Sequence, residues 1–197
     1  LIDVDGRRYF DAISSLWVTT LGHRVAELDA ALREQLDRVA HTTLLGNGNR
    51  ATIEFAEQLA RVVPVDAPHV LFASDGACAV EQALKIAFQF WRNRGVQGRD
   101  TYLTFSGAYH GDTVGALSLG GAQLGADLFE RLRFPVIRAP SCEDPAALRV
   151  AARMVREHAG RLAAVVVEPL VQGAAGMLIA NPEDFRQLAD ACRESDV

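Results

Sequence analysis

The chain has 197 residues, of which 49% are hydrophobic and 23% are charged, so it can bury a core and is not a disordered chain. Its formal net charge of −5 offers no basic surface to nucleic acid or to an anionic membrane, and no apolar run approaches the roughly 18 residues that a membrane-spanning helix needs. The three cysteines form no C-x-x-C pair, which argues against a disulfide framework or a zinc site and favours a reducing, cytoplasmic location.

The N-terminal part of the chain predicts a hairpin followed by two amphipathic helices. Residues 1–10 are typical of a small hairpin, and residues 25–40 and 50–62 carry apolar residues at helical spacing. Between the hairpin and the first helix, the charge-poor segment that contains Trp17 could line a pocket. A buried core position for Trp17 is the alternative. The polar, glycine-containing loop at 41–49 is of a kind that often contributes to sites, although exposed turns explain such loops equally well.

A short apolar run at residues 70–73 leads into Ser-Asp-Gly-Ala at 74–77, and apolar residues then recur at helical spacing as far as Trp91. This pattern predicts a strand, a tight turn and a helix. Asp75 or the serine before it can cap the first amides, and Gly76 lets a ligand approach the backbone. The unpaired amides at such a helix start suit a phosphate. An ordinary turn without a ligand is the alternative, because the pattern is looser than a nucleotide-binding fingerprint.

The rest of the chain alternates between apolar strands and amphipathic helices. We expect strands at 101–105, 134–138 and 162–167, helices at 144–158 and from Asn181 onward, and a glycine-rich surface excursion near the site at 115–125. This alternation predicts an α/β fold with a mainly parallel sheet flanked by helices.

Two of the predicted strands are followed by residues that carry chemistry. Tyr109, which has small neighbours, can lie flat against a planar ring, with His110 beside it. Glu168 directly follows a buried strand, and Gln172 comes soon after it. The carboxyl ends of parallel strands meet at the edge where such sheets bind ligands. A packed aromatic turn and a salt-bridged glutamate are the alternatives, and no further cluster of His or Cys supports a metal at His110 and Asp112.

A turn for phosphate, an aromatic face, and the carboxylate of Glu168 with the amide of Gln172 together suit a flat, phosphorylated cofactor. Nicotinamide dinucleotides fit poorly, because no G-x-G-x-x-G follows a strand, and pyridoxal phosphate fits better. A rival of another class is a cysteine-dependent acyl transferase, with Cys78 as the thiolate and His110 as the base. A small cysteine packed in the first turns of a helix explains Cys78 more simply.

Five motifs, in this order, resemble those of the class III pyridoxal-phosphate aminotransferases, and the likeness covers essentially the whole chain. They are Asp11–Trp17, His41–Gly46, Ser74–Lys85, Gly107–Thr113 and Glu168–Met177. The resemblance implies an incomplete large domain of the aspartate-aminotransferase type. Residues 1–45 would belong to the N-terminal segment and small domain, and residues 46–197 to the first part of the cofactor-binding domain.

The resemblance also implies roles for individual residues. Gly76, Ala77, Tyr109, His110 and Glu168 would form the cofactor site, and Leu16, Trp17 and Tyr109 would line the substrate pocket. Many relatives have serine at the position of Ala77, so here the backbone amides must hold more of the phosphate. Many also have a second tryptophan at the position of Leu16, which changes the shape of the pocket and bears on the amino donor.

In this family an aspartate that bonds the pyridine nitrogen and a Schiff-base lysine lie further along the chain, so we expect this chain to be a fragment without its own catalytic residues. Lys85 is the only lysine, and it lies too far beyond the phosphate turn to replace the missing one. The resemblance implies small-molecule substrates and a homodimer, with the loop at 41–49 near the partner's site. Other ω-aminotransferases and an inactive binding module remain alternatives.

Overall fold

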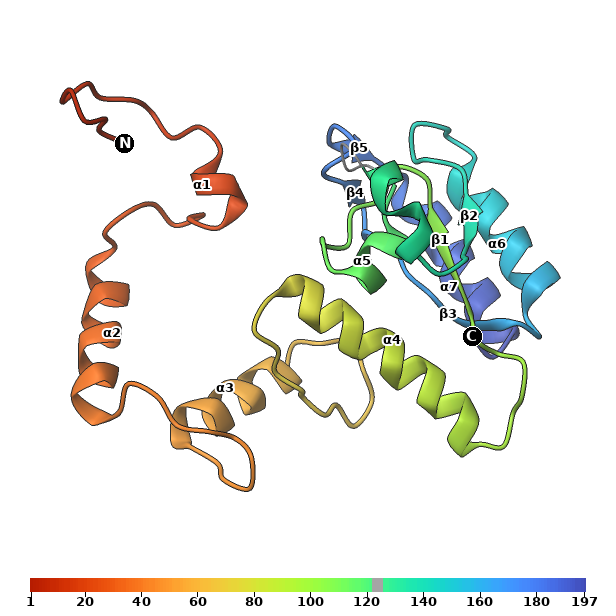
Figure 1. The fold of residues 1–197 in the computed structure, drawn as a ribbon, viewed down its shortest axis with the longest axis horizontal. Helices are drawn as coiled ribbons and strands as arrows, with labels where there is room; N and C mark the ends of the chain where they lie inside the picture. Colours follow the sequence, from red (N-terminus) through yellow and green to blue (C-terminus); the bar gives the residue numbers. More distant parts are fainter. Residues whose placement is uncertain (122–125) are drawn as a thin grey trace. The chain divides into compact units, whose positions relative to one another are not determined.

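The computed structural model describes residues 1–121 and 126–197, which form two compact units, Leu1–Val70 and Leu71–Val197 (Figure 1). The first unit contains helices α1 (Ser14–Trp17), α2 (Ala26–Arg38) and α3 (Arg50–Ala60). The second contains α4 (Gly76–Asn93), β1 (Thr101–Phe105), α5 (Val114–Leu119), the 3₁₀ helix η1 (Ala126–Leu132), β2 (Ile137–Ala139), α6 (Ala147–His158), β3 (Leu162–Val165), β4 (Val171–Gln172), β5 (Leu178–Ile179) and α7 (Pro182–Glu194).

The first unit confirms the predicted hairpin and both predicted helices. Ile2 and Arg8 pair as an antiparallel bridge, and α2 and α3 lie within the predicted ranges. The side chain of Asn49 caps α3 by accepting a hydrogen bond from Thr52 N at 2.9 Å. Trp17 is 50% exposed, so it does not belong to a core of this unit.

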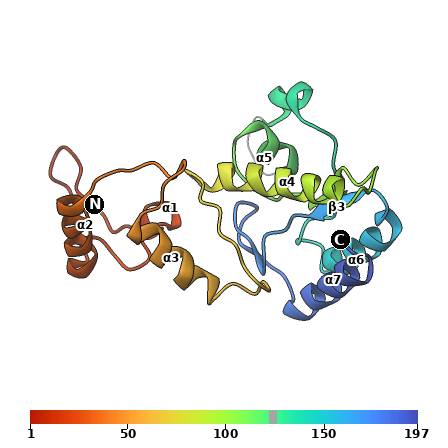
Figure 2. The same cartoon turned by 90° about the horizontal axis from the view of Figure 1, so that it is seen from below.

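The second unit is an α/β fold built on a parallel sheet, as the sequence predicts. Strand β1 is central, and it pairs in parallel with β2 and with β3. Helices α4 and α5 cover one face of this sheet, and α6 and α7 lie side by side on the other (Figure 2). A separate antiparallel pair, β4 and β5, follows β3 and was not predicted from the sequence.

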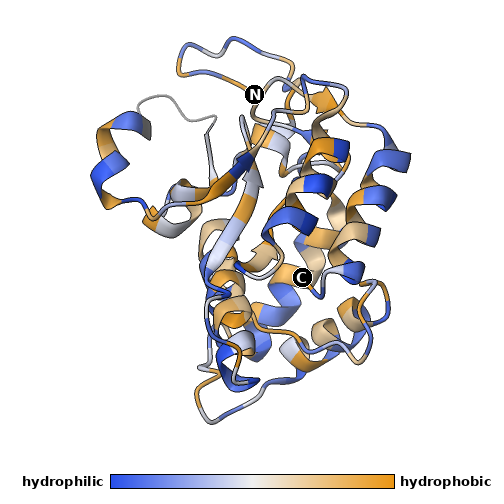
Figure 3. Cartoon of the chain, turned by 90° about the vertical axis from the view of Figure 1, so that its right-hand side faces the viewer, coloured by the Kyte–Doolittle hydropathy of each residue, from blue (hydrophilic) through white to orange (hydrophobic). Residues whose placement is uncertain are grey.

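Alternating side chains of β1 divide the core of the second unit into two parts. Leu103 and Phe105 pack against α6 and α7, and Tyr102 packs against α4 and α5. On that second face, the indole of Trp91 donates to Ala163 O at 2.9 Å. The helices place hydrophobic and hydrophilic residues on different sides, as this layered arrangement requires (Figure 3). None of the helices in the described residues combines the length and apolarity needed to cross a membrane.

Three predicted segments differ in the structure. Residues 70–73 form no strand, because no strand of the described residues pairs with them. Strand β2 begins at Ile137, later than predicted, because Pro135 has no amide for a ladder and Phe134 packs beside Tyr102. The predicted surface excursion at 115–125 is instead a buried helix over Val114–Leu119, and its residues 122–125 lie outside the described part of the chain.

Candidate active site

A cleft of about 760 Å³ lies where the start of α4 meets the loop that follows β1. The carboxyl ends of parallel strands lie at one edge of a sheet, and the loop after β1 lies at that edge. Helix α4 runs from this edge toward the opposite one, so its first turn lies near the same loop. The cleft is lined by Asp75, Gly76, Ala77, Val80, Tyr109, His110, Gly111, Asp112 and Thr113. Four of the five residues predicted for the cofactor site therefore lie together at one cleft.

The start of α4 faces the cleft with its first backbone amides. Asp75 caps the helix by accepting a hydrogen bond from Cys78 N at 2.8 Å, and that bond lowers the pKa of the Asp75 carboxyl. A Cβ added to Gly76 would meet nothing within 4 Å, so the backbone at this point faces open space. The first amides of an α-helix have no acceptor in the preceding turn, and the helix dipole is positive there. This geometry fits a phosphate group.

The loop that carries the aromatic residue is seated directly on that helix start. Gly111 has φ +125°, and a Cβ added to it would lie 2.5 Å from Ala77 Cβ, so only glycine permits this approach. Tyr109 is 38% exposed, and its hydroxyl donates to Asp112 Oδ2 at 3.0 Å. The same hydrogen bond raises the pKa of Tyr109, so the phenol stays protonated. A ring held in this way can cover a planar group in the cleft.

His110 is largely enclosed by the protein, with Nε2 3.5 Å from Thr104 Oγ1. Burial lowers the pKa of His110, the Arg138 charge lowers it further, and the Glu168 charge opposes both. Burial therefore favours the neutral form of the imidazole.

Glu168 connects two loops through backbone amides. Its Oε1 accepts from Tyr109 N at 2.9 Å, and its Oε2 accepts from Gly173 N at 2.9 Å. Glu168 thus lies against the loop of the cleft although it does not line the cleft itself. The structure shows it holding Tyr109 in place, and a direct contact with a cofactor stays a prediction.

The sequence offers Gln172 as an amide for the cofactor, but in the structure its side chain binds other loops and does not line the cleft. It is 2% exposed, its Nε2 donates to Ser106 O at 3.2 Å, and its Oε1 accepts from Cys142 N at 2.8 Å and from Ser141 Oγ at 3.3 Å. These partners follow β1 and β2, and Gln172 itself follows β3, so one amide joins the ends of all three strands. The sequence shows Gln172 only as a polar residue a few positions beyond an apolar strand. That position does not reveal which groups its side chain binds.

The remaining candidates lie elsewhere. Leu16 and Trp17 belong to α1 in the first unit, and their place in a substrate pocket stays a prediction. Cys78 does not line the cleft and Asp75 binds its amide, so nothing pairs it with His110 in the way an acyl transferase requires. Within the described ranges no cluster of His, Cys, Asp and Glu is arranged to hold a metal ion.

Comparison with known proteins agrees with this geometry. The model of the family "Aminotransferase class-III" matches residues 1–197. An adenosylmethionine-8-amino-7-oxononanoate aminotransferase from Nitratidesulfovibrio vulgaris is 47% identical over 207 residues, which cover 98% of this chain and 38% of that protein.

Solved structures show the same similarity. The crystal structure of adenosylmethionine-8-amino-7-oxononanoate aminotransferase from Methanocaldococcus jannaschii matches with a TM-score of 0.94 and 37% identity, over 100% of this chain and 45% of that one. An amine transaminase from an uncultivated Pseudomonas species, solved in a PLP-bound form, matches with a TM-score of 0.86 and 30% identity, over 100% of this chain and 48% of that one. The chain thus spans less than half the length of each of these proteins. Because the family model covers every residue, the chain belongs to the class III aminotransferases.

Proposed function

We propose that the protein to which this chain belongs is a pyridoxal-phosphate-dependent transaminase that aminates 8-amino-7-oxononanoate in biotin biosynthesis, with adenosylmethionine as the donor. The observation that carries this proposal is the seating of the Tyr109 loop on the start of α4, where Gly111 packs against Ala77. That contact brings a helix start whose amides suit a phosphate and an exposed aromatic ring to one cleft. The names of the relatives point to the substrate and to the donor.

The residues of this chain would hold the cofactor without reacting themselves. Backbone amides at Gly76 and Ala77 would bind the phosphate, and Tyr109 would lie against the pyridine ring. His110 would support that ring as a neutral imidazole, and Glu168 would fix the loop through the Tyr109 amide. When bound, pyridoxal phosphate supplies the electron sink that amino-group transfer needs.

Ala77 fits this assignment although it brings no hydroxyl. Its Cβ already meets Gly111 closely, so the loop and the helix start are in direct contact. A serine hydroxyl at this position would add one more donor to the phosphate, whereas alanine leaves the phosphate to the backbone and to the helix dipole. We therefore infer that the phosphate is bound mainly by main-chain groups.

Two assignments from the sequence belong to the proposal as well. We propose that residues 1–45 belong to the N-terminal segment and small domain and residues 46–197 to the large domain, and that Leu16 and Trp17 line the substrate pocket. We also propose a cytoplasmic homodimer. In the first unit α2 exposes Leu28 at 51%, Leu32 at 66% and Leu36 at 64%, and another surface normally covers such an apolar stripe. Light scattering on the full-length protein tests the dimer, and a monomer at micromolar concentration would contradict it.

The function is tested on the full-length protein in two steps. First, added pyridoxal phosphate should bind and, after borohydride reduction, remain attached to a lysine other than Lys85. That residue is exposed, does not line the cleft, and has its Nζ 3.5 Å from Gln82 Oε1. Absence of cofactor binding, or attachment at Lys85, would contradict the proposed site.

Second, the loaded enzyme should aminate 8-amino-7-oxononanoate faster with adenosylmethionine than with lysine, ornithine or 4-aminobutyrate as donor. The last two donors represent the rival ω-aminotransferases. A clear preference for one of them would keep the cofactor assignment and overturn adenosylmethionine as the donor, and no amination of 8-amino-7-oxononanoate with any donor would overturn the acceptor.

A further inference from the structure

Glu81 is a charged residue that no part of the proposed chemistry uses, yet it lies one helical turn beyond Ala77 on the same face of α4. Its Oε1 accepts hydrogen bonds from Thr113 Oγ1 at 2.6 Å, from Gly115 N at 2.8 Å and from Ala116 N at 3.3 Å. The carboxylate therefore lies at the start of α5, where free amides and the helix dipole stabilise a negative charge.

Two close contacts join α4 to the chain segment that lines the cleft. Gly111 meets Ala77, and four residues later on both segments Gly115 meets Glu81. A Cβ added to Gly115 would lie 2.6 Å from Glu81 Cδ, so the carboxylate occupies the space that a side chain would need. Tyr109 and His110 directly precede this paired segment, so its position sets theirs.

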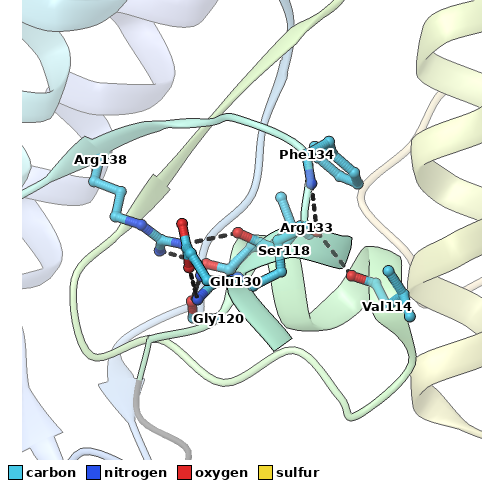
Figure 4. A network of polar contacts seen from close by, with 8 residues as sticks. Val114, Ser118, Gly120, Glu130, Arg133, Phe134 and Arg138 are labelled. Atoms are coloured by element: carbon cyan, nitrogen blue, oxygen red, sulfur yellow. Dashed lines mark hydrogen bonds and ion pairs between the residues drawn. The ribbon is translucent and has the colours of Figure 1, made fainter. Parts of the chain in front are cut away.

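The far end of α5 is held as firmly as its start. Arg138 donates to Leu119 O at 2.9 Å and to Ser118 O at 2.7 Å, and Arg133 donates to Gly120 O at 3.1 Å (Figure 4). Positive groups at the C-terminus and a carboxylate at the N-terminus both oppose the helix dipole. Arg133 and Arg138 hold the far end independently of Glu81, so a loss at Glu81 would release only the end of α5 that leads to the cleft.

We propose that Glu81 is a positioning residue for the cofactor cleft: by binding Thr113 and the start of α5, it sets the separation between the amides that begin α4 and the loop with Tyr109. This inference rests on the proposed function, because it concerns the same cleft. It predicts that the charge at Glu81 contributes to cofactor affinity although the side chain does not reach the phosphate turn.

The test uses full-length protein with Glu81→Gln, which keeps the shape and removes the charge. Hydrogen bonds to a charged acceptor are roughly twice as strong as neutral ones, so the dissociation constant for pyridoxal phosphate, measured by fluorescence quenching, should rise about tenfold. In the cofactor-free protein, amide exchange at Gly115 and Ala116 should accelerate while exchange in α6 is unchanged. Glu157→Gln, an exposed carboxylate on α6, is the matched control and should leave both measurements at their wild-type values.

The outcomes separate this inference from the proposed function. Failure of the wild-type protein to bind pyridoxal phosphate overturns the proposed function. Tight wild-type binding with an unchanged dissociation constant in Glu81→Gln overturns the inference alone, even if the melting temperature falls. If Glu81→Gln does not fold, Gly115→Ala decides the matter, because it places a methyl group in the space of the Glu81 carboxylate at a residue that does not line the cleft. A raised dissociation constant in that variant supports the inference, and a wild-type value overturns it.

Discussion

Gln172→Leu should release the ends of the three parallel strands from one another. Leucine has a similar volume, so the change leaves little cavity, but it removes the acceptor for Cys142 N and the donor to Ser106 O. Each buried backbone group left without a partner costs about 1–3 kcal/mol. Because both partners are only half-buried, water replaces part of the loss, and we expect the free energy of opening to fall by about 2–4 kcal/mol.

Amide hydrogen exchange measures this free energy directly at Cys142, whose amide is protected by the Gln172 side chain. Gln187→Leu, at an exposed position of α7, provides the matched control and should change exchange at Cys142 by less than about 0.5 kcal/mol. Wild-type protection of Cys142 in the Gln172→Leu protein would show that the buried amide does not hold these loops, and the reasoning would be refuted.

Three further predictions concern single groups. Arg138→Met should lower stability by about 2 kcal/mol in thermal unfolding, because two carbonyls at the end of α5 lose a charged donor, and a wild-type melting temperature would contradict this. Trp91→Phe should cost about 1–3 kcal/mol, since it leaves the buried Ala163 carbonyl without its donor, and a neutral effect in urea unfolding would contradict it. The pKa of His110 is lowered in the folded protein, so its stabilising contribution should be lost as the pH falls below about 6.5, and His110→Gln should lack this pH dependence of the melting temperature.

The sequence predicts the layered fold well because the periodicity of the core residues is local. Apolar residues in α6 and the run that forms β3 each indicate their own element without knowledge of the partner. The strand expected at 70–73 fails for the complementary reason. A strand exists only if another strand pairs with it, and an apolar run carries no information about whether that partner is present.

The sequence predicted four of the residues that line the cleft, Gly76, Ala77, Tyr109 and His110, but not the contacts that hold them there. Tyr109 stands out because it is an aromatic residue in a glycine-containing loop after a predicted strand. Gly76 stands out because it lies in a turn directly before a predicted helix. The link from Glu81 to Thr113 spans 32 residues, and the link from Gln172 to Ser106 spans 66. Such pairings depend on which loops the sheet brings to one edge. For the same reason, the segment after Thr113 was taken for a surface excursion, although contacts with α4 make it a buried helix.

Three side chains hold the cleft, and all of them bind main-chain groups. Glu81 accepts from amides at the start of α5, Glu168 from the amides of Tyr109 and Gly173, and Gln172 bonds to backbone groups after β1 and β2. Every residue except proline provides these groups, so these contacts accept most side chains at the positions they bind. The exceptions are Gly111 and Gly115, which lie too close to α4 for a side chain, and Thr113, which donates its hydroxyl to Glu81. Alanine or serine at position 77 can therefore occupy the same framework. The side chains that face the cleft can then differ between proteins while the backbone at the start of α4 keeps its place.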